Sequence, residues 1–148
     1  MSKHDEVIEQ LKIIVKQKGL KYTEQREIVL RVLMSVEEHL TAEDVYNHIK
    51  STYKDSNIGI ATVYRALSFL EDVKLITSIA FGTEGKKYEA NLKAHHDHLI
   101  CTACGKIIEF LDEEIEKRQD NIAKVNNFKI TSHSMQLYGM CQECQAKD

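Results

Sequence analysis

Two Cys-x-x-Cys pairs constrain the fold of this chain more than any other feature. Cys101 and Cys104 form the first pair, Cys141 and Cys144 form the second, and residues 105–140 lie between them. Each pair can present two thiolates to one metal ion from a tight turn, and two pairs complete the tetrahedral four-sulfur set of structural zinc sites. The sequence therefore predicts a zinc ion that ties the end of the chain back to the first pair, a staple that decides whether a small domain folds.

Two other uses of these cysteines are less consistent with the sequence. Disulfides form in oxidising compartments, whereas the charged segment 1–10 lacks the apolar run of a secretion signal. A redox Cys-x-x-Cys would account for one pair and leave the second unexplained. The chain also has no apolar run near the ~20 residues of a membrane span. We therefore expect reduced, zinc-binding cysteines in a cytoplasmic protein without a membrane segment.

The first half of the chain has the hydrophobic period of helices. Apolar residues at helical spacing predict a helix that Gly19 closes, and Thr23 and Thr41 are candidate N-caps for the next two helices. A fourth helix is expected over 60–72, with Ile60 on its buried face. Strand-like runs at 75–81 and 86–90 flank Gly82-Thr83-Glu84-Gly85 and predict a hairpin. Helices followed by a two-stranded hairpin outline a winged helix-turn-helix.

The second half predicts a different lobe. Strands are expected at 95–101, 106–110 and 128–138, with a bulge near His133, and Asp112 is expected to open a helix. The whole chain is then α+β, with a winged helix-turn-helix over residues 1–90 and a small α/β lobe over residues 91–148.

The segment His95-His96-Asp97-His98 precedes the first cysteine pair. Because alternate residues of a strand face opposite sides, His96 and His98 point one way, and His95 and Asp97 point the other. Neither pair completes a metal site, so further ligands are needed, and each candidate taken alone could be an ordinary surface residue. The candidates are Glu89, Glu109, Glu116, His133 and His39. A nitrogen and oxygen site without thiolate suits Fe(II), Mn(II), Co(II), Ni(II) or Zn(II).

The fourth helix carries side chains that can contact DNA. In a winged helix it is the one placed in the major groove, where Arg65 can pair with guanine or phosphate and Tyr64 can touch a thymine methyl group. Thr62 can bind backbone oxygens. The net charge of −3 argues against nucleic-acid binding, but residues 12–31 contain six Lys or Arg against Glu24 and Glu27. The acidic total therefore hides a basic N-terminal patch.

Three segments resemble the ferric uptake regulator family. They are Gly19 to Arg26 (GLKYTEQR), Gly59 to Arg65 (GIATVYR) and His95 to Lys106 (HHDHLICTACGK). The match covers nearly the whole chain in the family's order. It implies a winged helix-turn-helix DNA-binding domain over residues 1–90 joined to a small α/β dimerisation domain over residues 91–148. It also implies a metal-dependent transcriptional repressor that binds A/T-rich palindromic double-stranded DNA as a homodimer, or as a tetramer.

The resemblance also assigns residues to sites. Three metal sites are implied: a structural Zn(II) on Cys101, Cys104, Cys141 and Cys144; a regulatory site of His39, Glu89, His96, His98 and Glu109; and an additional site of His95, Asp97, Glu116 and His133. DNA contacts fall on Lys21, Arg26, Thr62, Tyr64 and Arg65. Members of the peroxide-sensing branch have Asp in place of Glu89 and Glu109, so Fe(II) is the expected regulatory metal, for which Mn(II), Co(II) or Zn(II) can substitute.

Other functions are kept as alternatives. Zinc-, manganese-, nickel- and peroxide-responsive members of the family share much of the pattern. A metal-dependent hydrolytic enzyme or a metal-storage module would also use a cluster of histidines and carboxylates. No nucleophile and base stand beside that cluster, and both classes leave Tyr64, Arg65 and the basic patch unexplained. We therefore expect a regulator and not an enzyme.

Overall fold

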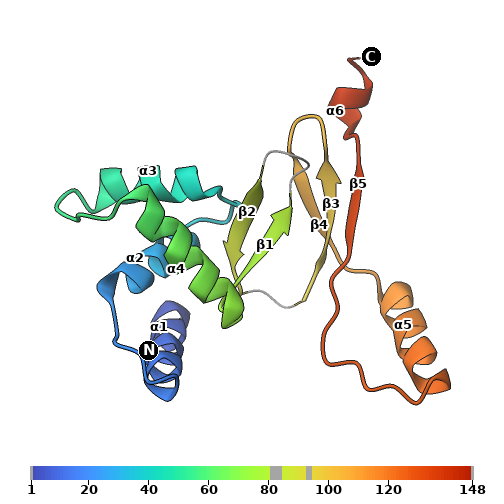
Figure 1. Ribbon diagram of the computed structural model, residues 1–148. Helices are drawn as coiled ribbons and strands as arrows, with labels where there is room; N and C mark the ends of the chain where they lie inside the picture. The colour runs from blue at the N-terminus through green and yellow to red at the C-terminus, as the bar shows by residue number, and fades with distance from the viewer. Residues whose placement is uncertain (1, 81–84, 93–94, 148) are drawn as a thin grey trace. The chain divides into compact units, whose positions relative to one another are not determined.

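The computed structural model describes residues 2–80, 85–92 and 95–147 and divides the chain into two compact units, Met1–Leu92 and Lys93–Asp148. The first unit contains α1 (Lys3–Gln17), α2 (Glu24–Ser35), α3 (Ala42–Thr52), α4 (Ile60–Asp72), β1 (Ile76–Ala80) and β2 (Lys86–Ala90) (Figure 1). The second contains β3 (Asp97–Cys101), β4 (Ile107–Phe110), α5 (Glu113–Val125), β5 (Gln136–Gly139) and α6 (Gln142–Gln145).

The first unit is a winged helix-turn-helix, as the sequence predicts. Its core is built from one apolar stripe of each helix, with Leu11, Leu30, Ile49 and Leu67 at most 1% exposed. The helices α3 and α4 form the helix-turn-helix, and β1 pairs with β2 in an antiparallel wing with Ile76 opposite Ala90. Residues 82–84 of the expected hairpin turn lie outside the described residues.

Two predicted helix boundaries have clear local causes. Gly19 has φ +67°, a left-handed conformation that favours glycine, and it follows the C-cap Lys18 of α1. At the start of α3, the Thr41 hydroxyl accepts from the Asp44 N–H and the Asp44 carboxylate accepts from the Thr41 N–H, each at 3.1 Å. This reciprocal capping box satisfies backbone donors that the first turn leaves unpaired.

The second unit is a small α/β lobe. Its sheet has the order β4-β3-β5, with β3 antiparallel to β4 and parallel to β5. The Asp112 carboxylate caps α5 by accepting from the backbone N–H groups of Glu114 and Ile115. Figure 1 shows α5 beside one end of β5 and not laid across a face of the sheet.

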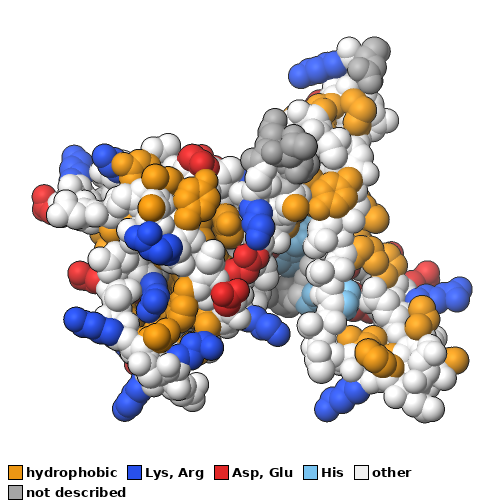
Figure 2. Space-filling model, in the orientation of Figure 1, with side chains coloured by type: hydrophobic (Ala, Val, Ile, Leu, Met, Phe, Trp, Pro, Cys, Tyr) orange, Lys and Arg blue, Asp and Glu red, His pale blue; other side chains and the backbone are white. Residues whose placement is uncertain are grey.

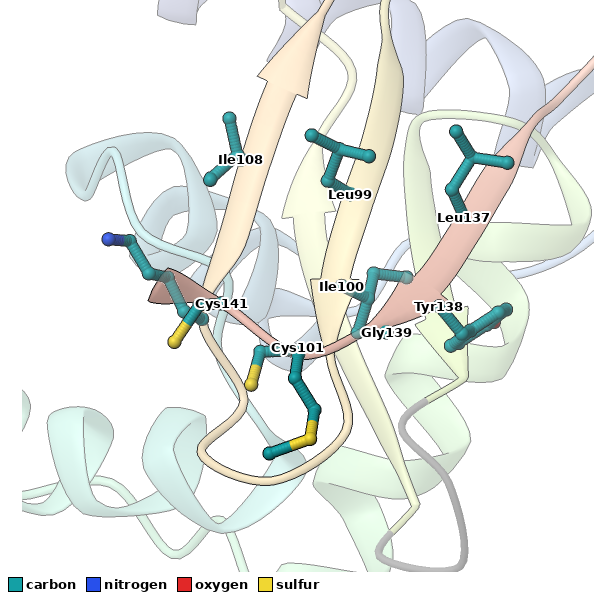
Figure 3. A pocket seen from close by; sticks show the side chains of 10 residues that line it. Leu99, Ile100, Cys101, Ile108, Leu137, Tyr138, Gly139 and Cys141 are labelled. Carbon is teal, nitrogen blue, oxygen red and sulfur yellow. The ribbon is translucent and has the colours of Figure 1, made fainter. Parts of the chain in front are cut away.

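One face of this sheet is apolar and exposed. Leu99 lies opposite Ile108 on β4 and opposite Leu137 on β5, so the three side chains form one row across the strands. They are 40%, 43% and 48% exposed. The row lines part of a hollow of about 190 Å³. Figure 3 shows the three side chains on their neighbouring strands. Apolar surface left open on a structured sheet marks an interaction site.

Two details of the sequence prediction are wrong. Ile60 is 39% exposed because it is the first residue of α4, directly after the N-cap Gly59, and so lies at the edge of the buried stripe. The last strand begins at Gln136 and not at Phe128, because β3 offers partners only from His98 to Cys101. Residues 128–135 have no strand, so the imperfect alternation near His133 is not a bulge.

The capping box of α3 predicts an unequal response to two Thr→Ala substitutions. Thr41→Ala removes the side-chain acceptor and should lower the free energy of unfolding by about 1 kcal/mol, measured by urea denaturation of the zinc-loaded protein. Thr23 occupies the N-cap of α2 but makes no side-chain cap bond. Thr23→Ala is therefore the matched control and should change stability much less; equal losses would contradict this account of the cap.

Candidate metal centres and nucleic-acid interface

The four cysteines lie together at one end of the sheet of the second unit. Cys101 ends β3, Cys104 follows in the turn before Gly105, Cys141 is the N-cap of α6, and Cys144 lies within that helix. The Thr102 N–H donates to the Gly139 carbonyl at 2.9 Å, which holds the second pair beside the first. The four sulfur atoms lie within 4.8 Å of one another. The Sγ atoms of Cys104 and Cys141 are 3.7 Å apart, far beyond the ~2.05 Å of a disulfide.

The electrostatics of this cluster favour a cation. Backbone N–H groups of Cys141 and Cys104 donate to the Cys101 sulfur and lower the pKa of its thiol to about 6. In contrast, hydrogen bonds from Cys144 to the Cys141 and Cys104 sulfurs raise the pKa of Cys144 to about 12. Neighbouring thiols cannot all ionise unless positive charge is placed among them. Four converging sulfur atoms fit Zn(II), which lowers thiol pKa values on binding.

A second cluster joins β3, α5 and the segment before β5. It contains His95, Asp97, Glu116 and His133, whose nearest nitrogen and oxygen atoms lie within 4.8 Å of one another. The Nε2 atoms of His95 and His133 are 2.9 Å apart. Glu116 Oε1 is 3.1 Å from His133 Nε2, and Asp97 Oδ1 is 3.3 Å from His95 Nε2. These donors converge from three separate parts of the chain.

Asp97 shows that the second cluster fits a cation. Its side chain is 0% exposed, and neither carboxylate oxygen has a hydrogen-bond donor among the described residues. A buried carboxylate without donors is costly unless a positive charge compensates it. Two imidazoles and two carboxylates are a donor set for a divalent metal of intermediate softness.

The five residues of the implied regulatory site are divided between the two units. In the first unit, His39 Nε2 is 3.0 Å from Glu89 Oε2. The backbone places them together, because Leu40 and Tyr88 exchange two hydrogen bonds, Leu40 N–H to the Tyr88 carbonyl at 2.9 Å and Tyr88 N–H to the Leu40 carbonyl at 2.7 Å.

In the second unit, His98 lies on β3, Glu109 lies on β4, and His96 directly precedes β3. His98 lies opposite Glu109 in the ladder, and His96 Nε2 is 3.5 Å from Glu109 Oε1. The His96 and His98 rings have centroids 4.8 Å apart, while His95 and Asp97 belong to the separate cluster. The two-sided use of this segment follows the strand alternation predicted from the sequence.

The residues predicted to contact DNA lie in the first unit. Tyr64 is 45% exposed and Arg65 is exposed on α4, and the Arg65 guanidinium donates to the Thr62 hydroxyl at 3.1 Å. Lys21 is exposed in the segment between α1 and α2. Figure 2 shows Lys and Arg side chains distributed over this unit.

Arg26 has intramolecular contacts. Its guanidinium lies 4.1 Å from the centroid of the Phe69 ring and donates to the Lys21 carbonyl at 3.4 Å. It thus joins the segment carrying Lys21 to α4, and a direct DNA contact by Arg26 remains a prediction.

Sequence reasoning missed one residue beside Tyr64. The Tyr64 hydroxyl donates to Glu43 Oε1 at 2.8 Å, and this bond raises the pKa of the tyrosine above its ordinary value. Glu43 was visible only as an acidic residue in the first turn of α3, a position that favours acids for helix capping. No local pattern pairs it with a residue 21 positions later.

These features define a class: a winged-helix protein whose second lobe carries a four-cysteine centre and histidine–carboxylate metal ligands. The family model described as "Ferric uptake regulator family" matches residues 17–138. The chain belongs to the ferric uptake regulator family.

Individual relatives agree over most of the chain. A ferric uptake regulation protein of Campylobacter jejuni is 52% identical over 141 residues, which are 95% of this chain and 90% of that protein. A solved structure of the Helicobacter pylori ferric uptake regulator, described as having three functional metal binding sites, has a TM-score of 0.84 and 41% identity over 97% of this chain and 95% of that one. The Vibrio cholerae regulator has a TM-score of 0.72 and 40% identity, over 86% and 97%.

The described residues contain no helix that is both long and apolar enough to cross a membrane.

The four-sulfur centre predicts that one thiol substitution unfolds the second unit selectively. Cys144→Ser should remove the tightly bound zinc, because it takes away one of the four thiolates. The second unit should then unfold, because structural zinc contributes about 10–16 kcal/mol to the folding free energy of small peptides. Zinc content and hydrogen exchange would be measured together, with α1–α4 keeping their protection while β3–β5 lose theirs. Glu143→Gln, which leaves all four thiols, is the control. A Cys144→Ser protein with full zinc content and protected β3–β5 would contradict the assignment.

The buried carboxylate of Asp97 predicts that its removal lowers the number of metal ions bound. It also predicts that the stability of the protein before metal is added to this cluster does not fall. Asp97→Asn should bind one Co(II) fewer per zinc-loaded chain, measured by the cobalt absorption spectrum. Before cobalt is added its melting temperature should not fall, because the substitution removes a buried charge that has no hydrogen-bond donor. Glu114→Gln, on the exposed side of α5, should bind as many ions as the wild type. Unchanged stoichiometry in Asp97→Asn would exclude this cluster as a site.

Proposed function

We propose that this protein is a homodimeric transcriptional repressor that binds DNA when its regulatory site holds Fe(II). The observation that carries the proposal is the His39–Glu89 pair, which places two metal-ligand side chains inside the winged-helix unit. A ligand pair within the DNA-binding unit gives a metal a direct means of acting on DNA binding.

The two units take different roles in this proposal. The winged helix reads DNA through α4, and the α/β unit supplies the remaining ligands and the dimer contact. His39 and Glu89 on one side, and His96, His98 and Glu109 on the other, would hold one ion and so fix the angle between the units. In a dimer that angle sets the separation of two α4 helices, which must match the half-sites of a palindromic operator. The ion supplies the binding energy that favours this geometry.

The exposed apolar row of the second unit supports the dimer. Leu99, Ile108 and Leu137 lie on one face of the sheet, and a second copy of the chain presents the same surface. Such a self-complementary patch is typical of a two-fold interface. Assembly to a tetramer would need a further contact.

Fe(II) is compatible with the ligand types and is favoured among the candidate metals by the names of the relatives. The proposed regulatory set combines imidazole and carboxylate ligands without thiolate, which suits Fe(II) and also Mn(II), Co(II) and Zn(II). The Campylobacter jejuni and Helicobacter pylori relatives are ferric uptake regulation proteins by name. The His95–Asp97–Glu116–His133 cluster is proposed as an additional site that stabilises the second unit, and the four cysteines as the structural zinc site.

A regulator accounts for more of the chain than a metal-dependent hydrolase does. The relatives reported above are regulators, and hydrolysis would leave the exposed Tyr64 and Arg65 without a purpose. As a DNA-binding regulator the protein is expected to act in the cytoplasm. An A/T-rich palindrome is the proposed operator, with Lys21 entering its minor groove.

The regulatory site predicts metal-dependent DNA binding that requires His96 and His98. Wild-type protein should bind an A/T-rich palindromic duplex about 100-fold more tightly at ~100 times the metal dissociation constant. His96→Ala/His98→Ala should stay at the metal-free level, because it lacks two of the five proposed ligands. Fluorescence anisotropy under anaerobic conditions with Fe(II), Mn(II) and Zn(II) in turn would measure both effects and rank the metals.

His48→Ala provides the matched control, since His48 is an exposed residue of α3 that belongs to none of the three proposed ligand sets. It should respond to metal like the wild type. The proposal fails if the double variant remains fully metal-dependent, or if no metal alters DNA binding by the wild-type protein.

A further inference from the structure

Tyr64 is tied to the neighbouring helix of the helix-turn-helix. Its hydroxyl donates to Glu43 Oε1 at 2.8 Å, across 21 positions of sequence. Glu43 lies in the first turn of α3 and Tyr64 lies in the first half of α4. Because Tyr64 is 45% exposed, the pair lies at the surface from which a DNA-reading helix makes its contacts.

The acceptor in this bond has a fixed backbone. Glu43 stands between Thr41 and Asp44, the two partners of the capping box, whose hydrogen bonds are each 3.1 Å long. The residue before the box, Leu40, is held to the wing by two backbone hydrogen bonds with Tyr88. The first turn of α3 is therefore restrained both by its own cap and by β2.

We propose that Glu43 is a positioning residue for Tyr64 and thereby a determinant of the sequence specificity of DNA binding. An exposed tyrosine on a helix can occupy more than one rotamer, and ordering it on binding costs free energy. A hydrogen bond from its hydroxyl to a carboxylate on this restrained backbone favours one ring orientation beforehand. The ring is then already placed for apolar contact with a thymine methyl group, the only such group in the major groove.

A carboxylate serves this purpose better than a neutral acceptor. Its negative charge stands beside the reading surface, where it repels DNA phosphates. This repulsion is the same for every sequence, because phosphate contacts carry no sequence information. It lowers the overall affinity, so that stable binding depends more on the base contacts that Tyr64 makes.

The inference rests on the proposed function, in which Tyr64 touches bases. It is tested with full-length, zinc-loaded protein and Mn(II), by measuring the dissociation constants for an A/T-rich palindromic duplex and for a scrambled duplex of the same composition. The variants are Glu43→Ala, Glu43→Gln, Tyr64→Phe and the double variant Glu43→Ala/Tyr64→Phe. Asp55→Ala removes an exposed carboxylate beyond the other end of α3 and controls for net charge. Melting temperatures establish that each variant is folded.

The positioning role predicts a specific order among these variants. Glu43→Ala should lower the ratio of palindrome to scrambled affinity by up to about tenfold, the scale of ordering one side chain on binding. Glu43→Gln keeps an acceptor and removes the charge, so its affinities for the two duplexes should rise by a similar factor and their ratio should stay within about twofold of the wild type. Tyr64→Phe should lower the ratio as much as Glu43→Ala does, and the double variant should lower it no more than either.

Contrary results fall into two distinguishable groups. A wild-type protein without a metal-dependent preference for the palindrome would overturn the proposed function together with this inference. A wild type that shows the preference, combined with Glu43→Ala at the wild-type ratio, overturns the positioning role alone. Additive losses of the ratio in the double variant, or a ratio in Glu43→Gln as low as that in Glu43→Ala, also overturn it.

Discussion

The metal chemistry of this protein depends on the two-residue period of one short strand. Successive side chains of β3 point to opposite faces, so Asp97 and His98 contribute to different ligand sets although they are neighbours in sequence. Three residues later, Cys101 ends the strand and begins the four-sulfur centre. The strand is therefore a common backbone for all three proposed sites. A shift of one residue in its pairing with β4 would exchange the faces and separate His98 from Glu109, its partner in the ladder.

The second unit has little else to hold it together. Few of its apolar residues are buried, and those of its sheet and of α5 are largely exposed, as Ile108, Ile122, Val125 and Leu137 show. A lobe of this size cannot offset its conformational entropy with so small a core. Zinc in the four-sulfur centre would fix the end of β5 to the end of β3, and a metal in the His95–Asp97–Glu116–His133 cluster would fix α5 to the other end of β3. The proposed metal ligation and dimer contacts would thus replace the core that this unit lacks.

The sequence predicted what local periodicity and spacing determine. The helical spacing of apolar residues predicted α4 over 60–72, the bounds that the structure has. The spacing of Thr41 and Asp44 predicted the start of α3. The strand alternation separated His95 and Asp97 from His96 and His98. Long-range packing was not predictable in this way: β5 is short because β3 offers few partners, and the hydrogen bond between Glu43 and Tyr64 follows from how α3 crosses α4. The assembly of the regulatory set came from the family resemblance, because no local pattern joins His39 to His96.

The charge of one segment also differs from the charge of the unit that contains it. The first unit has 13 Lys and Arg against 14 Asp and Glu, so its basic character is confined to residues 12–31 and is not a property of the whole unit. Several of the acids have identifiable tasks: Asp44 closes the capping box, Glu89 faces His39, and Glu43 accepts from Tyr64. A DNA-binding unit that must release its operator has reason to avoid excess positive charge, since phosphate contacts alone would hold it on any sequence. A nearly neutral reading unit leaves the strength of binding to base contacts and to the geometry that the metal sets. The mild acidity of the chain is therefore compatible with DNA binding. It helps to keep that binding dependent on base sequence and on the proposed regulatory metal.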